Sequence, residues 1–261
     1  MDIDSYHAIQ VSRKGRVLEL ALNRPQSLNA IDEDLHDELA KVFYDAALDP
    51  DSDVLVITGR GRAFSAGGDL SWARTMAEDP DRFERTAVRG KRIVFSMLDC
   101  EKPIIAKLNG PAVGLGATIA LFADVIFASE HAVIGDPHVR VGVVAGDGGA
   151  VIWPQLIGYA RAKEYLMTGA TIPAAKAAEM GLINYVVPDA DLDAAVDDFI
   201  RRLLTNPIRA IRWTKTSINI GLKQIAHSVM DAGLAYEALT ARRPEHHAAL
   251  SAFLDAPKAK R

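Results

Sequence analysis

Short apolar runs alternate with amphipathic stretches along the first 190 residues of the chain. The run Val17–Leu22 predicts a strand that ends before Pro25, because proline lacks a backbone donor and restricts the residue before it. Similar apolar runs predict further strands at 54–58, 103–108, 124–128, 131–134 and 182–187.

Helical spacing of apolar residues marks the segments between these strands. Ile31, Leu35, Leu39 and Phe43 predict one helix, whose first turn carries the acidic residues that a helix dipole favours. A broken helix is expected from Leu70 to about Leu98. Shorter helices are expected at 117–122, 149–157, 160–167 and 173–180, the last of them ending at a left-handed Gly181.

No convincing strand follows Asp191, and three or four amphipathic helices fill the chain to Phe253. Strands mixed with helices, then helices alone, indicate an α/β fold. We expect an α/β core at residues 1–200 and a helical C-terminal region at 201–261, with a frayed basic tail at 257–261.

Composition and charge exclude several classes of protein. Of the 261 residues, 49% are hydrophobic and 25% charged, which is typical of a globular protein. The net charge of −4 argues against a nucleic-acid binder. No apolar run is long enough to span a membrane, and the N-terminus has no signal-peptide core, so we expect a cytoplasmic protein. The single cysteine, Cys100, is interpreted as a buried side chain in a reducing compartment.

Common catalytic motifs are absent from the sequence. It has no phosphate-binding loop with a lysine, no G-x-S-x-G, no H-E-x-x-H and no paired C-x-x-C. His246 and His247 are adjacent, so on a helix they point apart, and we interpret them as a solvated face. No metal site and no permanently bound cofactor is expected.

Two glycine-rich turns follow apolar strands, one at 63–70 and one at 109–116. Glycine lets the backbone approach a ligand closely, and a helix start directs free N–H groups outward. Two such groups on one carbonyl oxygen would form an oxyanion hole, which stabilises an enolate. Two ordinary turns are the alternative interpretation.

These turns belong to a longer series of motifs. Leu22-Asn23-Arg24-Pro25, Ser27-Leu28-Asn29-Ala30, the two glycine-rich turns, Met167-Thr168-Gly169 and the segment 177–183 occur in one order. In that order and spacing, from about residue 10 to 255, the chain resembles the enoyl-CoA hydratase/isomerase (crotonase) superfamily.

The resemblance implies a spiral of ββα units with a helical C-terminal region that assembles trimers or hexamers. It implies an acyl-CoA substrate, with coenzyme A as part of the substrate and no nucleic-acid or membrane partner. The N–H groups of Ala66 and Leu115 would hold the thioester oxygen. Substrate or CoA contacts would come from Arg24, Leu28, Ala66, Gly67, Gly68, Asp69, Leu70, Gly114 and Thr118.

The sequence departs from the family's hydratases at both catalytic glutamates. Thr118 and His138 occupy those two positions, and a threonine hydroxyl cannot serve as a free general base. A carboxylate occurs instead at Asp147, where family dienoyl-CoA isomerases carry an aspartate. Family hydrolases that cleave β-diketones pair a histidine and an aspartate at the positions of His138 and Asp147.

An imidazole beside a carboxylate can take and give a proton near neutral pH. We therefore predict that His138 and Asp147 are catalytic, with Asp136 a weaker candidate. Taken singly, His138 could be an ordinary histidine and Asp147 a helix N-cap. The leading hypothesis is an acyl-CoA enzyme of the hydratase/isomerase type that stabilises a thioester enolate. The alternatives are a C–C bond hydrolase of β-dicarbonyl compounds and a catalytically silent CoA-binding homologue.

Overall fold

The computed structural model describes residues 1–255, so the basic tail predicted at 257–261 lies outside the described residues. A six-stranded sheet runs through the molecule in the order β1-β2-β3-β4-β6-β9. Only the β1–β2 pair is antiparallel, and the other neighbours are parallel. The strands are β1 (Ile9–Lys14), β2 (Val17–Leu22), β3 (Val54–Gly59), β4 (Ile104–Leu108), β6 (Val125–Ser129) and β9 (Tyr185–Val187).

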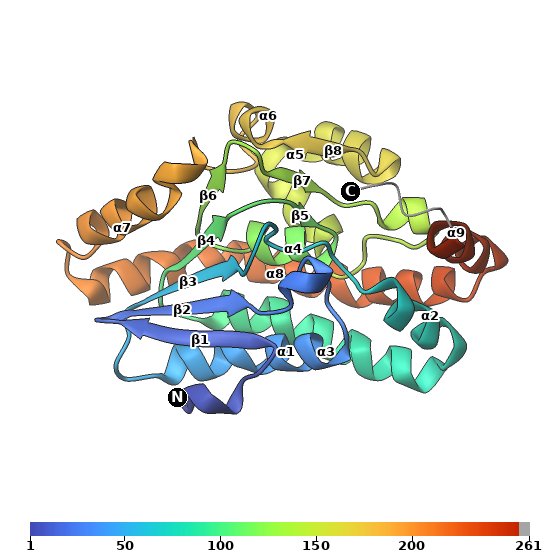
Figure 1. Cartoon of the computed structure of the whole chain (residues 1–261), viewed down its shortest axis with the longest axis horizontal. Coiled ribbons are helices and arrows are strands. Elements are labelled where there is room, and N and C mark those ends of the chain that lie inside the picture. The colour runs from blue at the N-terminus through green and yellow to red at the C-terminus, as the bar shows by residue number, and fades with distance from the viewer. Residues whose placement is uncertain (256–261) are drawn as a thin grey trace.

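A second sheet of three short strands lies beside the first, in the order β5-β7-β8. Its strands are β5 (Ala112–Val113), β7 (Val133–Gly135) and β8 (Thr171–Pro173). Along the chain after β4, β5 lies in the small sheet, β6 in the large one, β7 and β8 in the small one and β9 in the large one, so the backbone passes repeatedly between the two sheets (Figure 1). This mixed α/β architecture confirms the predicted fold class.

Helices cover both faces of the large sheet. On one face, α1 (Glu33–Leu48) packs against α3 (Pro80–Asp99), and α3 packs against α8 (Ile208–Ala241), the long helix that spans the molecule in Figure 1. On the other face, α7 (Leu192–Leu203) packs against β4 and β6. The remaining α-helices are α2 (Leu70–Glu78), α4 (Leu115–Leu121), α5 (Gly149–Thr168), α6 (Ala174–Glu179) and α9 (Pro244–Asp255).

Most elements occur where the apolar pattern predicted them. The two helices expected at 149–157 and 160–167 form one element, α5, which is broken at Gly158 by a φ of 77°. Gly181 has the expected left-handed conformation, with a φ of 79°. Cys100 is a buried core residue, as predicted. The boundary between a core and a C-terminal region at 200/201 stays a prediction, and α7 runs through it.

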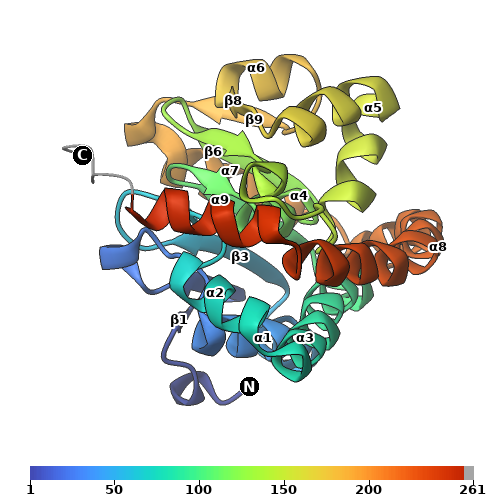
Figure 2. The same cartoon turned by 90° about the vertical axis from the view of Figure 1, so that its right-hand side faces the viewer.

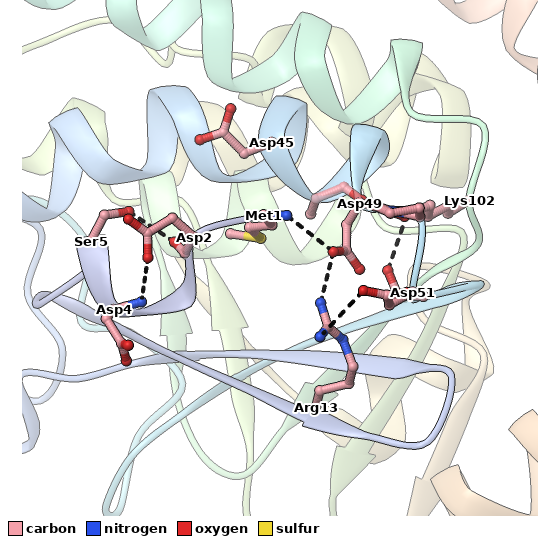
Figure 3. A network of polar contacts seen from close by, with 12 residues as sticks. Met1, Asp2, Asp4, Ser5, Arg13, Asp45, Asp49, Asp51 and Lys102 are labelled. Carbon is pink, nitrogen blue, oxygen red and sulfur yellow. Dashed lines mark hydrogen bonds and ion pairs between the residues drawn. The ribbon is translucent and has the colours of Figure 1, made fainter.

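A buried network at the C-terminal end of α1 ties that helix to the sheet (Figure 3). The Asp49 carboxylate accepts hydrogen bonds from the Met1 amino group at 3.2 Å and from Arg13 in β1 at 2.7 Å. Lys102, just before β4, donates to the carbonyls of Ala46 and Asp49 at 2.6 and 2.5 Å. A cation at these carbonyls complements the helix dipole, which fixes α1 against β1 and β4.

The C-terminal helix α9 lies across the body of the molecule, between α2 and the segment that follows β7 (Figure 2). It contacts α2 and the 3-10 helix His138–Val141. Within residues 1–255, no helix combines the length and the apolar character needed to cross a membrane.

Candidate active site

The first glycine-rich turn is held in place by the segment after β2. Leu28 and Asn29 both adopt left-handed backbone conformations, with φ values of 56° and 54°, which non-glycine residues rarely do. The buried Asn29 amide donates to the carbonyls of Arg60 and Ala63, each at 2.9 Å. The polar motif at 27–30 therefore shapes the turn that begins at Ala63.

The two glycine-rich turns lie against each other, as the oxyanion hypothesis requires. Ser65 donates from its N–H to the Pro111 carbonyl at 3.0 Å and accepts from the Val113 N–H at 2.9 Å. A Cβ added to Gly67 would lie 2.8 Å from the Val113 carbonyl oxygen. Glycine is therefore required at position 67 to let the two turns meet.

The N–H groups of the two turns differ in their availability. The Ala66 N–H donates to the Leu28 carbonyl at 2.9 Å, so it is already engaged. Within residues 1–255, the N–H groups of Gly68 and Leu115 donate no hydrogen bond. Leu115 is the first residue of α4, where a backbone N–H has no partner inside the helix. The geometry thus supports Leu115 as a donor and favours Gly68 over Ala66 as the other.

His138 lies directly beside the second turn. Its Cε1 atom is 3.7 Å from the position that a Cβ on Gly114 would occupy. The ring Nε2 faces the Asp147 carboxylate at 3.4 Å, and the ring Nδ1 bonds to Asp136. The two residues predicted from the sequence therefore meet at the turn that carries the Leu115 N–H. Asp136, the weaker candidate, joins them.

Thr118 orients the Asp147 carboxylate. This residue lies in α4, one turn after the free N–H of Leu115, and its hydroxyl donates to Asp147 Oδ1 at 3.2 Å. Asp147 precedes α5, and the Gly148 at the N-cap of that helix has a φ of 126°. A threonine thus takes a supporting role at the position where family hydratases carry a glutamate.

Burial and charge shift the proton affinities of these groups. Burial lowers the pKa of His138, but the carboxylates of Asp136 and Asp147 raise it more, so its pKa lies well above the ordinary 6.5. Burial raises the pKa of Asp147, although His138 and the hydrogen bond from Thr118 act against this rise. The pKa values of both groups are therefore raised, that of His138 by the two carboxylates and that of Asp147 by burial.

Sequence analysis missed Glu237, a partly buried residue of α8. A Cβ on Gly146 would lie 2.9 Å from its Oε2 atom, and this oxygen has no hydrogen-bond partner within the described residues. Burial and the nearby Asp147 raise the pKa of Glu237 to about 8. No local signal could have found it, because it is one acidic residue in a long amphipathic helix.

Most of the predicted substrate and CoA contacts lie around the first turn, and Gly114 and Thr118 lie at the second turn and in α4. The Arg24 guanidinium pairs with Asp32 at 2.8 Å and with Asp69 at 3.8 Å, and it also donates to the Ala30 carbonyl. Asp69 caps α2, accepting from the Ser71 N–H at 3.0 Å, and Leu70 is the first residue of that helix. The contact of these residues with CoA stays a prediction.

The expectation of a solvated His246 is wrong. His247 is exposed, but His246 is buried and its Nδ1 bonds to the Val141 carbonyl at 2.5 Å. This bond fastens α9 to the end of the 3-10 helix that begins with His138. Packing of α9 across the molecule buries this face, which helical spacing alone could not reveal.

Three side chains come close enough to hold a cation. One ligand atom from each of Asp136, His138 and Asp147 lies within 4.8 Å of the others. Both ring nitrogens of His138 already face carboxylates, however, so the ring is arranged to donate protons rather than to ligate an ion.

The fold is a spiral α/β arrangement in which two glycine-rich turns meet and His138 and Asp147 lie beside the second turn. The family model of enoyl-CoA hydratase/isomerase matches residues 12–259, and the protein belongs to this family. A curated relative, the short-chain-enoyl-CoA hydratase of Clostridium acetobutylicum, is 32% identical over 230 residues, covering 87% of this chain and 85% of the relative.

Solved structures agree with this assignment. An enoyl-CoA hydratase/isomerase from Mycobacterium paratuberculosis is 38% identical with a TM-score of 0.88, over 94% of this chain and 97% of that one. A β-diketone hydrolase from the cyanobacterium Anabaena, bound to (S)-3-oxocyclohexyl acetic acid, is 30% identical with a TM-score of 0.86. It covers 92% of this chain and 96% of its own.

Proposed function

We propose that the protein acts on an acyl-CoA thioester, stabilises its enolate in an oxyanion hole and moves protons with His138 and Asp147. The observation that carries this proposal is the position of the His138 ring against the Gly114 turn, with Asp147 Oδ2 at 3.4 Å from its Nε2 atom. A group that exchanges protons thus lies beside the free N–H of Leu115, where an oxyanion would form.

In this mechanism, the N–H groups of Leu115 and Gly68 bind the thioester oxygen. Negative charge develops on that oxygen when the substrate loses a proton from carbon or gains a nucleophile. Asp147 accepts a proton and His138 returns one, so that the pair ends the cycle in its starting state. Coenzyme A enters and leaves as part of the substrate.

Water addition to crotonyl-CoA is not the reaction that these residues favour. Family hydratases use two glutamates, and here Thr118 and His138 stand in those positions. The Thr118 hydroxyl donates a hydrogen bond to Asp147, and it is not basic enough to activate water at neutral pH. Proton transfer between carbons, as in an isomerase, needs only one acid and one base.

A second candidate function is the hydrolysis of a C–C bond in a β-dicarbonyl compound. The histidine–aspartate pair favours it, and a β-diketone hydrolase is among the structures similar to this chain at 30% identity. The same pair would then activate water, and the oxyanion hole would hold the leaving enolate. A catalytically silent homologue is disfavoured, because His138 and Asp147 converge on the glycine turn.

One experiment separates these functions. The purified protein is incubated with crotonyl-CoA, a dienoyl-CoA and a cyclic β-diketone, and mass spectrometry follows water addition, isomerisation or chain cleavage. We expect isomerisation of the dienoyl-CoA, with slow hydration of crotonyl-CoA. In parallel, acetoacetyl-CoA is titrated by calorimetry. Cleavage of the diketone without binding of the thioester would establish the second function instead.

We further propose a homotrimer or homohexamer. Large apolar side chains of α8 are exposed in the single chain, which a partner copy would cover. They are Trp213, Ile218, Ile220, Tyr236 and Leu239. Light scattering is expected to give three or six times the 28.2 kDa chain mass, and a monomer or dimer alone would refute the proposal.

A further inference from the structure

The His138 ring lies between two carboxylates, one on each nitrogen. Nδ1 bonds to Asp136 Oδ1, and the same oxygen accepts the His138 backbone N–H at 3.3 Å. Nε2 faces Asp147 Oδ2 at 3.4 Å. A ring with a carboxylate beside each nitrogen is favoured in its doubly protonated form, because the positive charge then lies next to two negative groups.

Asp136 is built into this position. Its side chain has no exposed surface, and a Cβ on Gly149 would lie 2.2 Å from its Oδ2 atom. Gly149 is the first residue of α5, so the carboxylate lies against a helix N-terminus, which favours a negative charge. Only a glycine at position 149 leaves room for it.

The stability of the fold gives no reason for a carboxylate at position 136, as its second oxygen shows. Oδ2 is buried and has no hydrogen-bond partner within the described residues. An unpartnered buried carboxylate oxygen costs free energy, and an asparagine or apolar residue would avoid the cost of the charge. The site retains a carboxylate, and within residues 1–255 the side chain that hydrogen-bonds to it is that of His138.

We propose that Asp136 is a positioning residue that, together with Asp147, keeps His138 doubly protonated at rest and so makes it the proton donor of the site. Asp147 is then the acceptor. This assignment of roles deepens the proposed function and rests on it, whereas the protonation state of the ring can be measured without any substrate.

The other charges around His138 are consistent with this assignment. The acidic groups that face the ring are Asp136 from the loop after β7, Asp147 from the loop before α5 and Glu237 from α8. The pKa of Glu237 is raised to about 8, so this group is mostly neutral at pH 7. The charge that holds the ring proton therefore comes mainly from the two aspartates, which raise the pKa of His138.

The test is magic-angle-spinning NMR on sedimented protein that carries ¹⁵N only in histidine. Loss of one signal in His138→Gln assigns the ring of interest. In the wild type we expect both nitrogens of His138 to be protonated at pH 7. In Asp136→Asn, which keeps an acceptor oxygen but removes the charge, the titration midpoint of the ring should fall by about 1–3 pH units.

Asp124→Asn is the matched control, since it removes a carboxylate that pairs with Lys215 at 2.7 Å outside the site. In this variant, the titration midpoint of the His138 ring should equal that of the wild type. A wild-type ring that is neutral at pH 7, or an unchanged midpoint in Asp136→Asn, overturns the proposal. If Asp136→Asn does not fold, the spectra of the wild type and of Asp147→Asn test the proposal instead. Asp147→Asn should also lower the titration midpoint of the ring, because each aspartate should help to keep the ring doubly protonated.

Kinetics supply a second readout. On the substrate found by the screen, Asp136→Asn should lower kcat by about 10²-fold with little change in KM. The alkaline limb of its kcat profile should move to lower pH together with the ring midpoint, and a limb that stays in place contradicts the donor role. A doubly protonated ring without turnover of any tested substrate would refute the proposed function and leave the ring state established.

Discussion

The Thr118 hydroxyl donates to the Asp147 carboxylate at 3.2 Å, joining the first turn of α4 to the loop before α5. Thr118 therefore orients the carboxylate of Asp147, which is the acidic partner of His138. Thr118 and Asp147 lie far apart in the sequence but form one hydrogen-bonded unit in the structure. The third member of the site, His138, lies between Asp147 and Asp136.

Thr118→Val should weaken catalysis without changing the fold. It keeps the shape of the side chain but removes a hydrogen bond to a charged group, which is worth about 1.5–3 kcal/mol. We expect kcat to fall by about 10-fold or more, with KM nearly unchanged. Thr118→Ser keeps the hydroxyl and should retain most of the activity. Equal activity of the valine and serine variants would show that the bond does not matter.

Leu115→Pro tests the oxyanion hole at a single N–H. Leu115 is the first residue of α4, where proline fits the backbone and removes only a donor that the helix does not use. We expect a loss of about 10²–10³-fold in kcat. Leu115→Ala loses the same side chain but keeps the N–H, so it should be far more active. If both variants lose activity equally, the N–H is not the cause.

Gly146→Ala should destabilise the loop that carries Asp147. Its Cβ would lie 2.3 Å from the Gly233 carbonyl oxygen in α8, so one backbone must shift. We expect a loss of about 1–3 kcal/mol in the free energy of unfolding. Gly221→Ala in the same helix has nothing within 4 Å of its Cβ and should gain about 0.5–1 kcal/mol. Urea unfolding of the two variants measures both free energies of unfolding. Equal stabilities of Gly146→Ala and Gly221→Ala would contradict the prediction.

Glu237 should make stability depend on pH. Its pKa rises from 4.5 in the unfolded chain to about 8 in the folded protein, so the folded state binds the proton more tightly. The stabilisation is complete below pH 4.5 and is lost progressively as the pH rises toward 8. Glu237→Gln should therefore gain stability over the wild type as the pH rises. Unfolding curves at pH 5 and pH 8 test this, and parallel changes in both proteins would refute it.

The sequence predicted the large elements because burial imposes periodicity on long segments. Helix α1 has apolar residues at helical spacing, and strand β3 is a continuous buried run that is mostly apolar. The strand β1 was missed, because only Ile9 and Val11 are buried and charged residues end it. The short strands β5 and β8 exist through pairing with β7 rather than through local preference.

The site was only partly accessible to sequence analysis. His138 and Asp147 could be found because they lie in a motif next to the strands that position them. Glu237 comes from a helix ninety residues further along, and only tertiary packing brings it to Gly146. The choice between Ala66 and Gly68 depends on one backbone hydrogen bond, which side-chain identity does not encode.

The central claim is that His138 and Asp147 act as one proton-transfer unit on an enolate. The most direct measurement is deuterium incorporation into the acyl chain of the thioester substrate in D₂O, followed by mass spectrometry. The wild type should incorporate deuterium at carbon. His138→Gln, Asp147→Asn and the double variant should each be slower by about 10²–10⁴-fold, and by similar factors, because groups that act as a unit are not additive. Near wild-type exchange in either single variant would contradict the account.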